Sequence, residues 1–231
     1  MLAEFFKNSV FFGVTLSLLA YGIGVWLKNK FKLGLFNPLL ISIIVTIIFL
    51  VSMKIEYKSY YDVAKYISFL LTPATVCLAI PLYEQFEILK KNVVAILSGI
   101  IAGVITSLLC ILVMAIAFQF DHKQYVSLLP KSITTAIGMD VSKQLGGYIA
   151  ITTAIIIITG VVGNVLGELV FKIFSIKEPV ARGIALGTSS HAIGTAKAME
   201  LGEVEGAISS LSIVIAGIIT VVGASVFAGF M

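Results

Sequence analysis

Five long apolar runs recur along this chain of 231 residues, at 9–27, 36–53, 92–118, 148–171 and 206–231. Each is close to the roughly 20 residues that an α-helix needs to cross the hydrocarbon core of a bilayer. The whole chain is 59% hydrophobic and only 12% charged, so a water-soluble fold would lack the polar residues to cover its surface. The runs therefore predict an all-α polytopic membrane protein.

The few polar landmarks fit this class. The formal net charge is +4, and because an excess of Lys and Arg in membrane proteins usually records loop orientation, we expect no nucleic-acid partner. Cys77 and Cys110 fall inside apolar segments, where cysteine behaves as a small core residue rather than as part of a disulfide or metal site. We expect no metal and no cofactor. The start of the chain has no small-residue cleavage site, so the first helix is expected to stay.

Three stretches interrupt the apolar pattern. Residues 181–200 place Gly, Ser, Thr, His and two cations between apolar runs, and hydrocarbon would reject these groups in a regular lipid-facing helix. Residues 62–84 contain Thr-Pro-Ala-Thr at 72–75, where proline removes a helical N–H and kinks or opens the helix. Residues 128–147 are too polar for a lipid-facing span. We predict broken helices at 62–84 and 181–200, and a re-entrant hairpin or a cavity-lining helix at 128–147; the sequence leaves open whether 128–147 and 181–200 cross the membrane or re-enter.

A weak internal repeat relates the two halves of the chain at an offset of about 114 to 116 residues. Residues 72–75 align with 188–191, and 98–103 align with 212–217. Many transporters consist of two such halves in opposite orientations, so we predict a transporter-like inverted-repeat bundle. The first repeat is 1–118, with spans at about 9–27, 36–53 and 92–118 and a broken segment at 62–84; the second is 119–231, with a re-entrant segment at 128–147, a span at 148–171, a broken segment at 181–200 and a span at 206–231.

The positions of the basic loops agree with two oppositely oriented repeats. Lysine and arginine concentrate in cytoplasmic loops of membrane proteins. If residues 128–147 return to the side from which they enter, all three basic loops fall on the cytoplasmic side, and the chain crosses seven times with its N-terminus outside and its C-terminus inside. The cations in these loops are Lys28, Lys30, Lys32, Lys90, Lys91, Lys172, Lys177 and Arg182.

Helix breaks inside a membrane create a site for an anion. A helix that restarts in the bilayer exposes free N–H groups at its new start. Two facing breaks, at 72–75 and 188–195, would place such starts near the bilayer centre, where the helix dipole favours a bound carboxylate. Small residues and hydroxyl groups would let the ligand approach and bond. The candidate substrate-binding residues are Thr72, Thr75, Lys131, Ser132, Thr134, Thr135, Arg182, Thr188, Ser189, Ser190, His191, Gly194 and Thr195.

Each candidate also has a purely structural interpretation. Ser and Thr hydroxyls often bond to their own helix, a buried histidine can serve packing, and Lys131 and Arg182 can extend towards an interface. Asn164, Glu168 and Asp140 are candidates for a coupling-ion site, although Asn164 and Glu168, one helical turn apart, also fit a polar contact between helices. A solvated helix end is expected at Glu200, Glu203 and Glu205.

Several short motifs, in this order along the chain, resemble those of the LrgB/CidB family. The motifs are Phe36-Asn37-Pro38-Leu39-Leu40, Thr72-Pro73-Ala74-Thr75-Val76 with Pro81-Leu82-Tyr83, Lys131-Ser132-Ile133-Thr134-Thr135, and the stretch from Ala181-Arg182-Gly183 to Ser190-His191-Ala192-Ile193-Gly194-Thr195-Ala196. The resemblance covers nearly the whole chain. Ala136 stands where the family often has proline, and Asp140 stands where glutamate is usual and keeps the carboxylate.

The resemblance implies two kinds of function. Bacterial members are named antiholin-like or holin-like and act with a small LrgA/CidA-type membrane protein to tune murein hydrolase activity and cell lysis. Other members, among them the plastid glycolate/glycerate translocator type and bacterial pyruvate systems, carry small monocarboxylates. The resemblance places the chain in the bacterial plasma membrane as a multi-pass protein.

Our leading hypothesis from the sequence is a transporter of small monocarboxylates such as pyruvate, glycolate or glycerate, working by alternating access and coupled to H⁺ or Na⁺. Paired helix breaks are costly to maintain in a protein that only binds a partner, and this favours transport. The alternative is an antiholin-like regulator of murein hydrolases and lysis that acts with an LrgA/CidA-type partner. We expect a homo-oligomer, and no enzyme, because no base-orienting residue accompanies Ser190 and His191.

Overall fold

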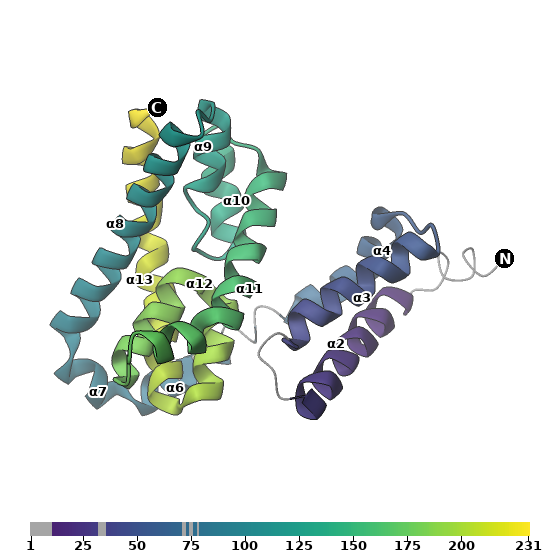
Figure 1. Ribbon diagram of the computed structural model, residues 1–231, viewed down its shortest axis with the longest axis horizontal. Coiled ribbons are helices and arrows are strands. Elements are labelled where there is room, and N and C mark those ends of the chain that lie inside the picture. Colours follow the sequence, from purple (N-terminus) through teal and green to yellow (C-terminus); the bar gives the residue numbers. More distant parts are fainter. Residues whose placement is uncertain (1–10, 32–35, 71–72, 74–75, 78) are drawn as a thin grey trace. The chain divides into compact units, whose positions relative to one another are not determined.

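Helices account for almost all of the described chain, and no strand occurs among the described residues. The computed structural model describes residues 11–231 except 32–35, 71–72, 74–75 and 78 (Figure 1). The chain forms two compact units, Met1–Cys77 and Leu78–Met231. The break predicted at 72–75, with the candidates Thr72 and Thr75, lies outside the described residues except for Pro73.

The first unit contains α2 (Phe12–Phe31), α3 (Pro38–Ser52), α4 (Tyr57–Ala64) and the 3₁₀ helix η1 (Lys65–Leu70). Helix α3 begins where the sequence predicts, because the Asn37 side chain accepts hydrogen bonds from the N–H groups of Leu39 (2.9 Å) and Leu40 (3.2 Å) and proline occupies the first turn. Gly24 of α2 packs directly on Pro38. Helices α2 and α3 cover the described parts of the first two predicted spans.

The second unit carries the remaining helices: α6 (Ala79–Glu84), α7 (Phe86–Lys91), α8 (Val93–Ala117), α9 (His122–Leu128), α10 (Thr135–Gln144), α11 (Ile149–Ile173), α12 (Pro179–Leu201), α13 (Glu203–Phe227) and the 3₁₀ helix η2 (Ala228–Phe230). Among the described helices, α8, α11 and α13 together with η2 are long and apolar enough to cross a membrane. Each presents large apolar side chains outward, as a lipid-facing helix does. The predicted class, an all-α membrane protein, is confirmed.

Helix α12 reverses direction at its centre. Ser190 (φ −132°, ψ 15°) and His191 (φ 43°, ψ −138°) leave the helical region. A Cβ added at Gly194 would touch the carbonyl oxygen of Leu186 and lie 2.6 Å from the Ser190 Cβ. In a continuous helix, residues 186 and 194 are about 12 Å apart along the axis. We call residues 179–189 the first arm of α12 and residues 192–201 the second arm.

Contacts with α13 show that the two arms are antiparallel. Along the first arm, Gly183 packs on Glu205 and Ile208, and Gly187 packs on Ser209 and Ser212, so residue numbers rise together. Along the second arm, the residue numbers of the arm and of α13 run in opposite senses. Thr195 bonds Ser209 (Oγ1 to Oγ, 2.7 Å), whereas Met199 packs on Gly206. The predicted break within 188–195 is therefore confirmed, and residues 179–201 form a re-entrant hairpin whose tip is Ser190–His191.

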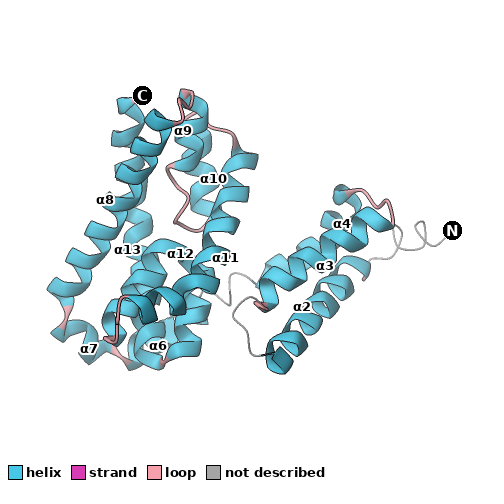
Figure 2. Ribbon diagram, in the orientation of Figure 1, coloured by secondary structure: helices cyan, strands magenta, loops and turns pink. Residues whose placement is uncertain are grey.

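Residues 128–147 also return to the end of the unit where they start. The N–H of Tyr148 donates to Ser127 Oγ (2.7 Å), and Thr152 Oγ1 donates to the Ser127 carbonyl (2.9 Å). Between these ends, the loop joining α9 to α10 extends into the unit, where Pro130 packs on Gly138 (Figure 2). The segment is a second hairpin, with its tip at 131–134.

The two hairpins enter from opposite ends of the second unit. Helix α8 runs parallel to the first arm, because Gly99 faces Ile184 and Gly103 faces Thr188. Helix α11 runs the other way, because Gly163 faces Ser190 and Gly167 faces Leu186. The open end of the α12 hairpin, which we call its mouth, therefore lies at the start of α8 and the end of α11. Residues 128–147 start from the other end of the unit. Figure 1 shows the same arrangement, with α9 and α10 in the upper part of the unit and α12 in the lower part.

This geometry corrects the predicted topology. Because α12 turns back, it does not cross, and α13 starts at the end of the unit that holds Lys90 and Lys177. Helix α13 finishes at the opposite end, where His122 Nδ1 lies 2.5 Å from the Met231 carbonyl oxygen. Within the second unit, Met231 therefore lies at the end opposite Lys177, where the sequence predicted the same side, whereas Lys90 and Lys177 share one end, as predicted. The sequence alone does not distinguish a crossing helix from a re-entrant hairpin at α12, because its 23 residues are long enough to span the membrane.

Candidate binding site between two hairpin tips

The tips of the two hairpins meet beside α8 and α11 and border two cavities. The α8 cavity, about 820 Å³, lies between α8 and the first arm; it is lined by residues that include Gly99, Gly103, Ser107, Cys110, Lys131, Ser132, Thr188 and Ser189. The α11 cavity, about 330 Å³, is lined by Lys131, Ile158, Thr159, Val162, Gly163, Ser189 and Ser190. Four predicted substrate-binding residues thus line the α8 cavity, and Lys131 and Ser189 line both.

Lys131 is the cation at this junction. Its Nζ donates a hydrogen bond to Ser132 Oγ (2.9 Å), and Ser132 Oγ lies 3.4 Å from Ser107 Oγ of α8. Lys131 forms no ion pair with any residue that the structure describes. A half-buried ammonium without a carboxylate partner loses hydration that a bound anion would replace. The cation therefore favours an anionic ligand at the tips.

The tip of the α12 hairpin presents three consecutive hydroxyl groups. Ser189 Oγ donates to the Ala185 carbonyl (2.7 Å) and lies 2.9 Å from Ser190 Oγ. Thr188 is buried, with its methyl group against Gly103, and within the described part of the chain its Oγ1 has no hydrogen-bond partner. An unpaired buried hydroxyl costs about 1 to 3 kcal/mol. The α8 cavity, which Lys131 also lines, thus includes a residue with unused hydrogen-bonding capacity.

His191 supports the reversal rather than either cavity. Its side chain is 4% exposed, and Nε2 lies 3.0 Å from the Ile156 carbonyl oxygen; because a carbonyl only accepts, Nε2 carries the proton. The ring lies against Gly160, where a Cβ would approach Nε2 to 2.8 Å. The positive φ of this non-glycine residue costs on the order of 1 to 3 kcal/mol. Thr195 Oγ1 donates to the His191 carbonyl (3.1 Å), so both residues fix the start of the second arm.

Two helix starts point their positive ends towards the tips. Helix α10 begins at Thr135 after an extended Thr134 whose side chain makes no capping bond. The second arm begins directly after His191. The first N–H groups of each helix have no partner within that helix, and the dipole favours negative charge there. Thr134 and Thr135 therefore lie at the positive end of α10, and Gly194 lies where the two arms approach each other closely.

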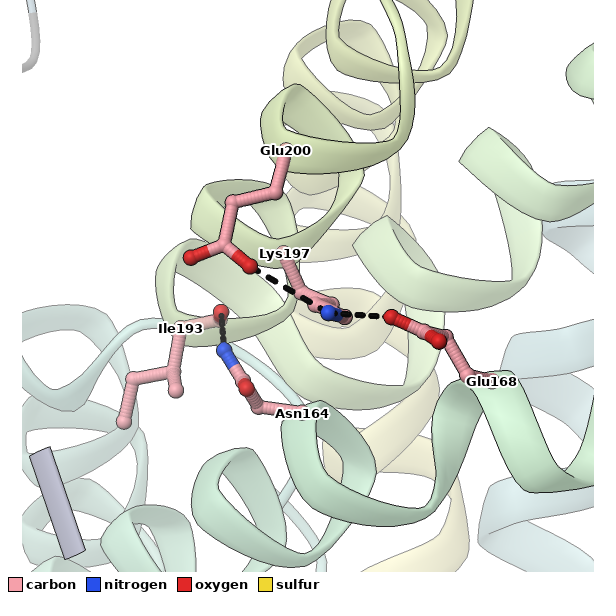
Figure 3. A network of polar contacts seen from close by, with 5 residues as sticks. All are labelled: Asn164, Glu168, Ile193, Lys197 and Glu200. Carbon is pink, nitrogen blue, oxygen red and sulfur yellow. Dashed lines mark hydrogen bonds and ion pairs between the residues drawn. The ribbon is translucent and has the colours of Figure 1, made fainter. Parts of the chain in front are cut away.

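The coupling-ion candidates make contacts between helices. Asn164 Nδ2 donates to the Ile193 carbonyl (2.8 Å), and Glu168 pairs with Lys197, which also pairs with Glu200 (3.2 Å) (Figure 3). These contacts hold the second arm against α11 and favour the interpretation as a polar contact between helices. Asp140 is exposed on α10 and lines neither cavity. The ion-coupling role of these three residues stays a prediction.

Arg182 lies apart from the two tips. It lines a separate pocket of about 350 Å³ that also includes Lys172 and Lys177. Its Nε donates to the Ile176 carbonyl (2.8 Å), and a guanidinium nitrogen lies 3.8 Å from Glu205 Oε1. Glu205 is 6% exposed, so the expectation that it is solvated is wrong. These contacts fasten the mouth of the α12 hairpin to the start of α13.

Sequence reasoning missed the cavity residues contributed by the spanning helices. Ser107, Cys110 and Thr159 each lie in an uninterrupted apolar run, and no local pattern separates them from residues that face lipid. Cys110 is exposed to the α8 cavity, so the expectation that it is a core residue is wrong. If the face of α8 that meets α12 were known, Ser107 and Cys110 could have been predicted as cavity residues.

Fold and site together define an all-helical membrane protein in which two re-entrant hairpins meet at a polar, cationic site. The chain belongs to the LrgB-like family, whose model matches residues 17–230. It is 41% identical over 222 residues to the antiholin-like protein LrgB of Bacillus cereus strain B4264, a match that covers 96% of each chain. The antiholin-like protein LrgB of Bacillus anthracis strain A0248 gives the same values. No solved structure matches the chain.

Proposed function

We propose that this protein is an antiholin-like protein of the bacterial plasma membrane, and that its molecular activity is the transport of small organic monocarboxylates. The names of its relatives support the first part, because they are antiholin-like proteins that match almost the full chain. The geometry of the hairpin tips supports the second part. The two roles are compatible, since a protein that controls lysis can do so by moving a metabolite.

The observation that carries the transport proposal is Lys131 at the junction of two cavities without an ion-pair partner among the described residues. A carboxylate placed there would meet the ammonium, the hydroxyl groups of Thr188 and Ser189, and the positive ends of α10 and the second arm. Re-entrant hairpins that meet in mid-membrane also provide the discontinuous helices on which secondary transporters build their sites.

Uptake into proteoliposomes tests the transport activity. Protein reconstituted with lipid is expected to accumulate labelled pyruvate, glycolate or glycerate, and Lys131→Gln is expected to reduce the rate at least tenfold because the anion loses its counter-charge. Lys143→Gln is the matched control, since Lys143 is exposed on α10 and lines neither cavity. Equal rates for the wild type, both variants and protein-free liposomes would refute transport.

The antiholin-like role is proposed to involve an LrgA/CidA-type partner in the control of murein hydrolases. A strain that lacks the protein is expected to lyse at an altered rate, and the wild-type chain is expected to restore normal lysis. If transport underlies this control, Lys131→Gln fails to restore it. If Lys131→Gln restores lysis control but not uptake, the two roles are separate. Gly99 and Gly103 are unsuitable as probes of an oligomer surface, because both face the first arm of α12.

A further inference from the structure

We propose that Lys131, together with Ser189, forms the side-chain layer between two approaches to a single site, so that its ammonium is reached from the α8 cavity and from the α11 cavity in alternation. The inference rests on the proposed transport of monocarboxylates. It adds the position of the permeability barrier and a limit on the charge of the cargo.

The two cavities lie on different sides of the hairpin tips, one against α8 and one against α11, and we propose that they open to opposite faces of the membrane. Both include Lys131 and Ser189 in their walls. The α8 cavity extends to Asn92 and Glu178, which precede α8 and α12 at the mouth of the α12 hairpin. The α11 cavity lies beside the tip itself, along residues 158 to 163 in the middle of α11. A solute that follows both cavities must pass the ammonium.

The charged residues in the cavity walls determine which substrate charge the site accepts. Lys131 is the one charged residue among the described residues that line the α11 cavity, and the α8 cavity adds Glu178 alone, at its mouth. A single carboxylate at Lys131 therefore leaves no net charge at the tips. A dicarboxylate would bring a second negative charge to an apolar wall with no cation to receive it, and this costs binding free energy. The site is selective for monoanions.

Chemical labelling from each side of the membrane tests the position of the barrier. In a Cys77→Ser/Cys110→Ser background, one cysteine is introduced at a time by Lys131→Cys, Ala181→Cys or Thr159→Cys, and vesicles of both orientations receive a membrane-impermeant thiol reagent. Ala181 lines the α8 cavity alone and Thr159 the α11 cavity alone. The cysteine at 131 is expected to react from both sides, and those at 181 and 159 from one side each, on opposite faces. Reaction at 131 from one side only, or at 181 and 159 from the same side, overturns the proposal.

Chemical rescue tests the role of the charge and shows whether the variant folds. Lys131→Cys removes the ammonium, and aminoethyl methanethiosulfonate attaches a short chain that ends in an ammonium group. This reagent is expected to raise pyruvate uptake by Lys131→Cys at least fivefold, whereas methyl methanethiosulfonate, which adds a neutral group, leaves it low. Equal effects of the two reagents, or no effect of either while Lys143→Cys, outside both cavities, leaves uptake normal, overturn the role of the charge.

Competition separates this inference from the proposed function. Unlabelled pyruvate is expected to slow labelling at 131 from both sides by at least threefold, and malonate at the same concentration is expected to leave the rate unchanged. If no monocarboxylate slows labelling or enters proteoliposomes, the proposed function fails although access from two sides can still be observed. If uptake is normal but malonate competes as well as pyruvate, the limit to monoanions fails while the transport proposal stands.

Discussion

Thr188 occupies the point of the α12 hairpin where packing and binding make opposite demands. Its methyl group fills the space that Gly103 leaves on α8, while its Oγ1 is buried without a hydrogen-bond partner in the described part of the chain. A residue selected for packing alone would be valine, which has the same shape and no hydroxyl to desolvate. The retained hydroxyl therefore favours a ligand that completes its hydrogen bonding.

Thr188→Val is expected to separate the two demands. Without a ligand, the variant should be more stable than the wild type by about 1 to 3 kcal/mol, because an unpaired buried hydroxyl is removed. Pyruvate should then raise the melting temperature less than it does for the wild type, because binding is weaker. Thermal unfolding in detergent, with and without pyruvate, measures both effects. Thr153→Val is the control, since Thr153 Oγ1 bonds the Ile149 carbonyl within its own helix (2.9 Å). An unchanged pyruvate shift in Thr188→Val contradicts a binding role.

At the scale of single elements, glycines of α11 determine whether α12 can turn. Gly160 receives the ring of His191, Gly163 receives the side chain of Ser190, and a Cβ added at Gly163 would overlap Ser190 Oγ. The sequence predicted the break from its polar residues, because Ser, Thr and His are unfavourable on a regular helix that faces hydrocarbon. It did not predict the reversal, because the close approach of α11 depends on contacts between residues far apart in the chain.

Gly163→Ala is expected to destabilise the protein by about 1 to 3 kcal/mol, since the added methyl group displaces the tip of the hairpin. Gly22→Ala is the matched control: Gly22 lies in α2 with no atom near its added Cβ, so the change should stabilise by about 0.5 to 1 kcal/mol through helix propensity. Melting temperatures in detergent compare the two. Ser190→Gly should restore part of the stability of Gly163→Ala. Equal effects at positions 163 and 22 would mean that the tip does not lie against α11.

At the scale of the whole molecule, the structure tests the predicted topology within the second unit, where it disagrees at one helix. Lys90 and Lys177 share an end of the second unit, as the distribution of cations requires. The disagreement concerns α12, which was predicted to cross the membrane. Its 23 residues match the length of a span, although each arm is only about half that long. Hydropathy cannot separate one crossing from two half-crossings, because both bury similar residues. Close contacts such as that of Gly194 with Leu186 decide between them.

The reversal of α12 makes a prediction about where the chain ends. If α8, α11 and α13 each cross the membrane, as their length and composition allow, Met231 should lie on the membrane face opposite Lys90 and Lys177, because both hairpins return. If the basic loops are cytoplasmic, as the excess of cations indicates, the C-terminus is outside. A protease-sensitive tag fused after Met231 should be cleaved in intact cells, whereas cysteines introduced by Lys90→Cys and Lys177→Cys in a Cys77→Ser/Cys110→Ser background should react with an impermeant reagent only in inverted vesicles. Protection of the tag in intact cells would mean that α12 crosses the membrane. The two cavities would then not open to opposite membrane faces, as the proposed path requires.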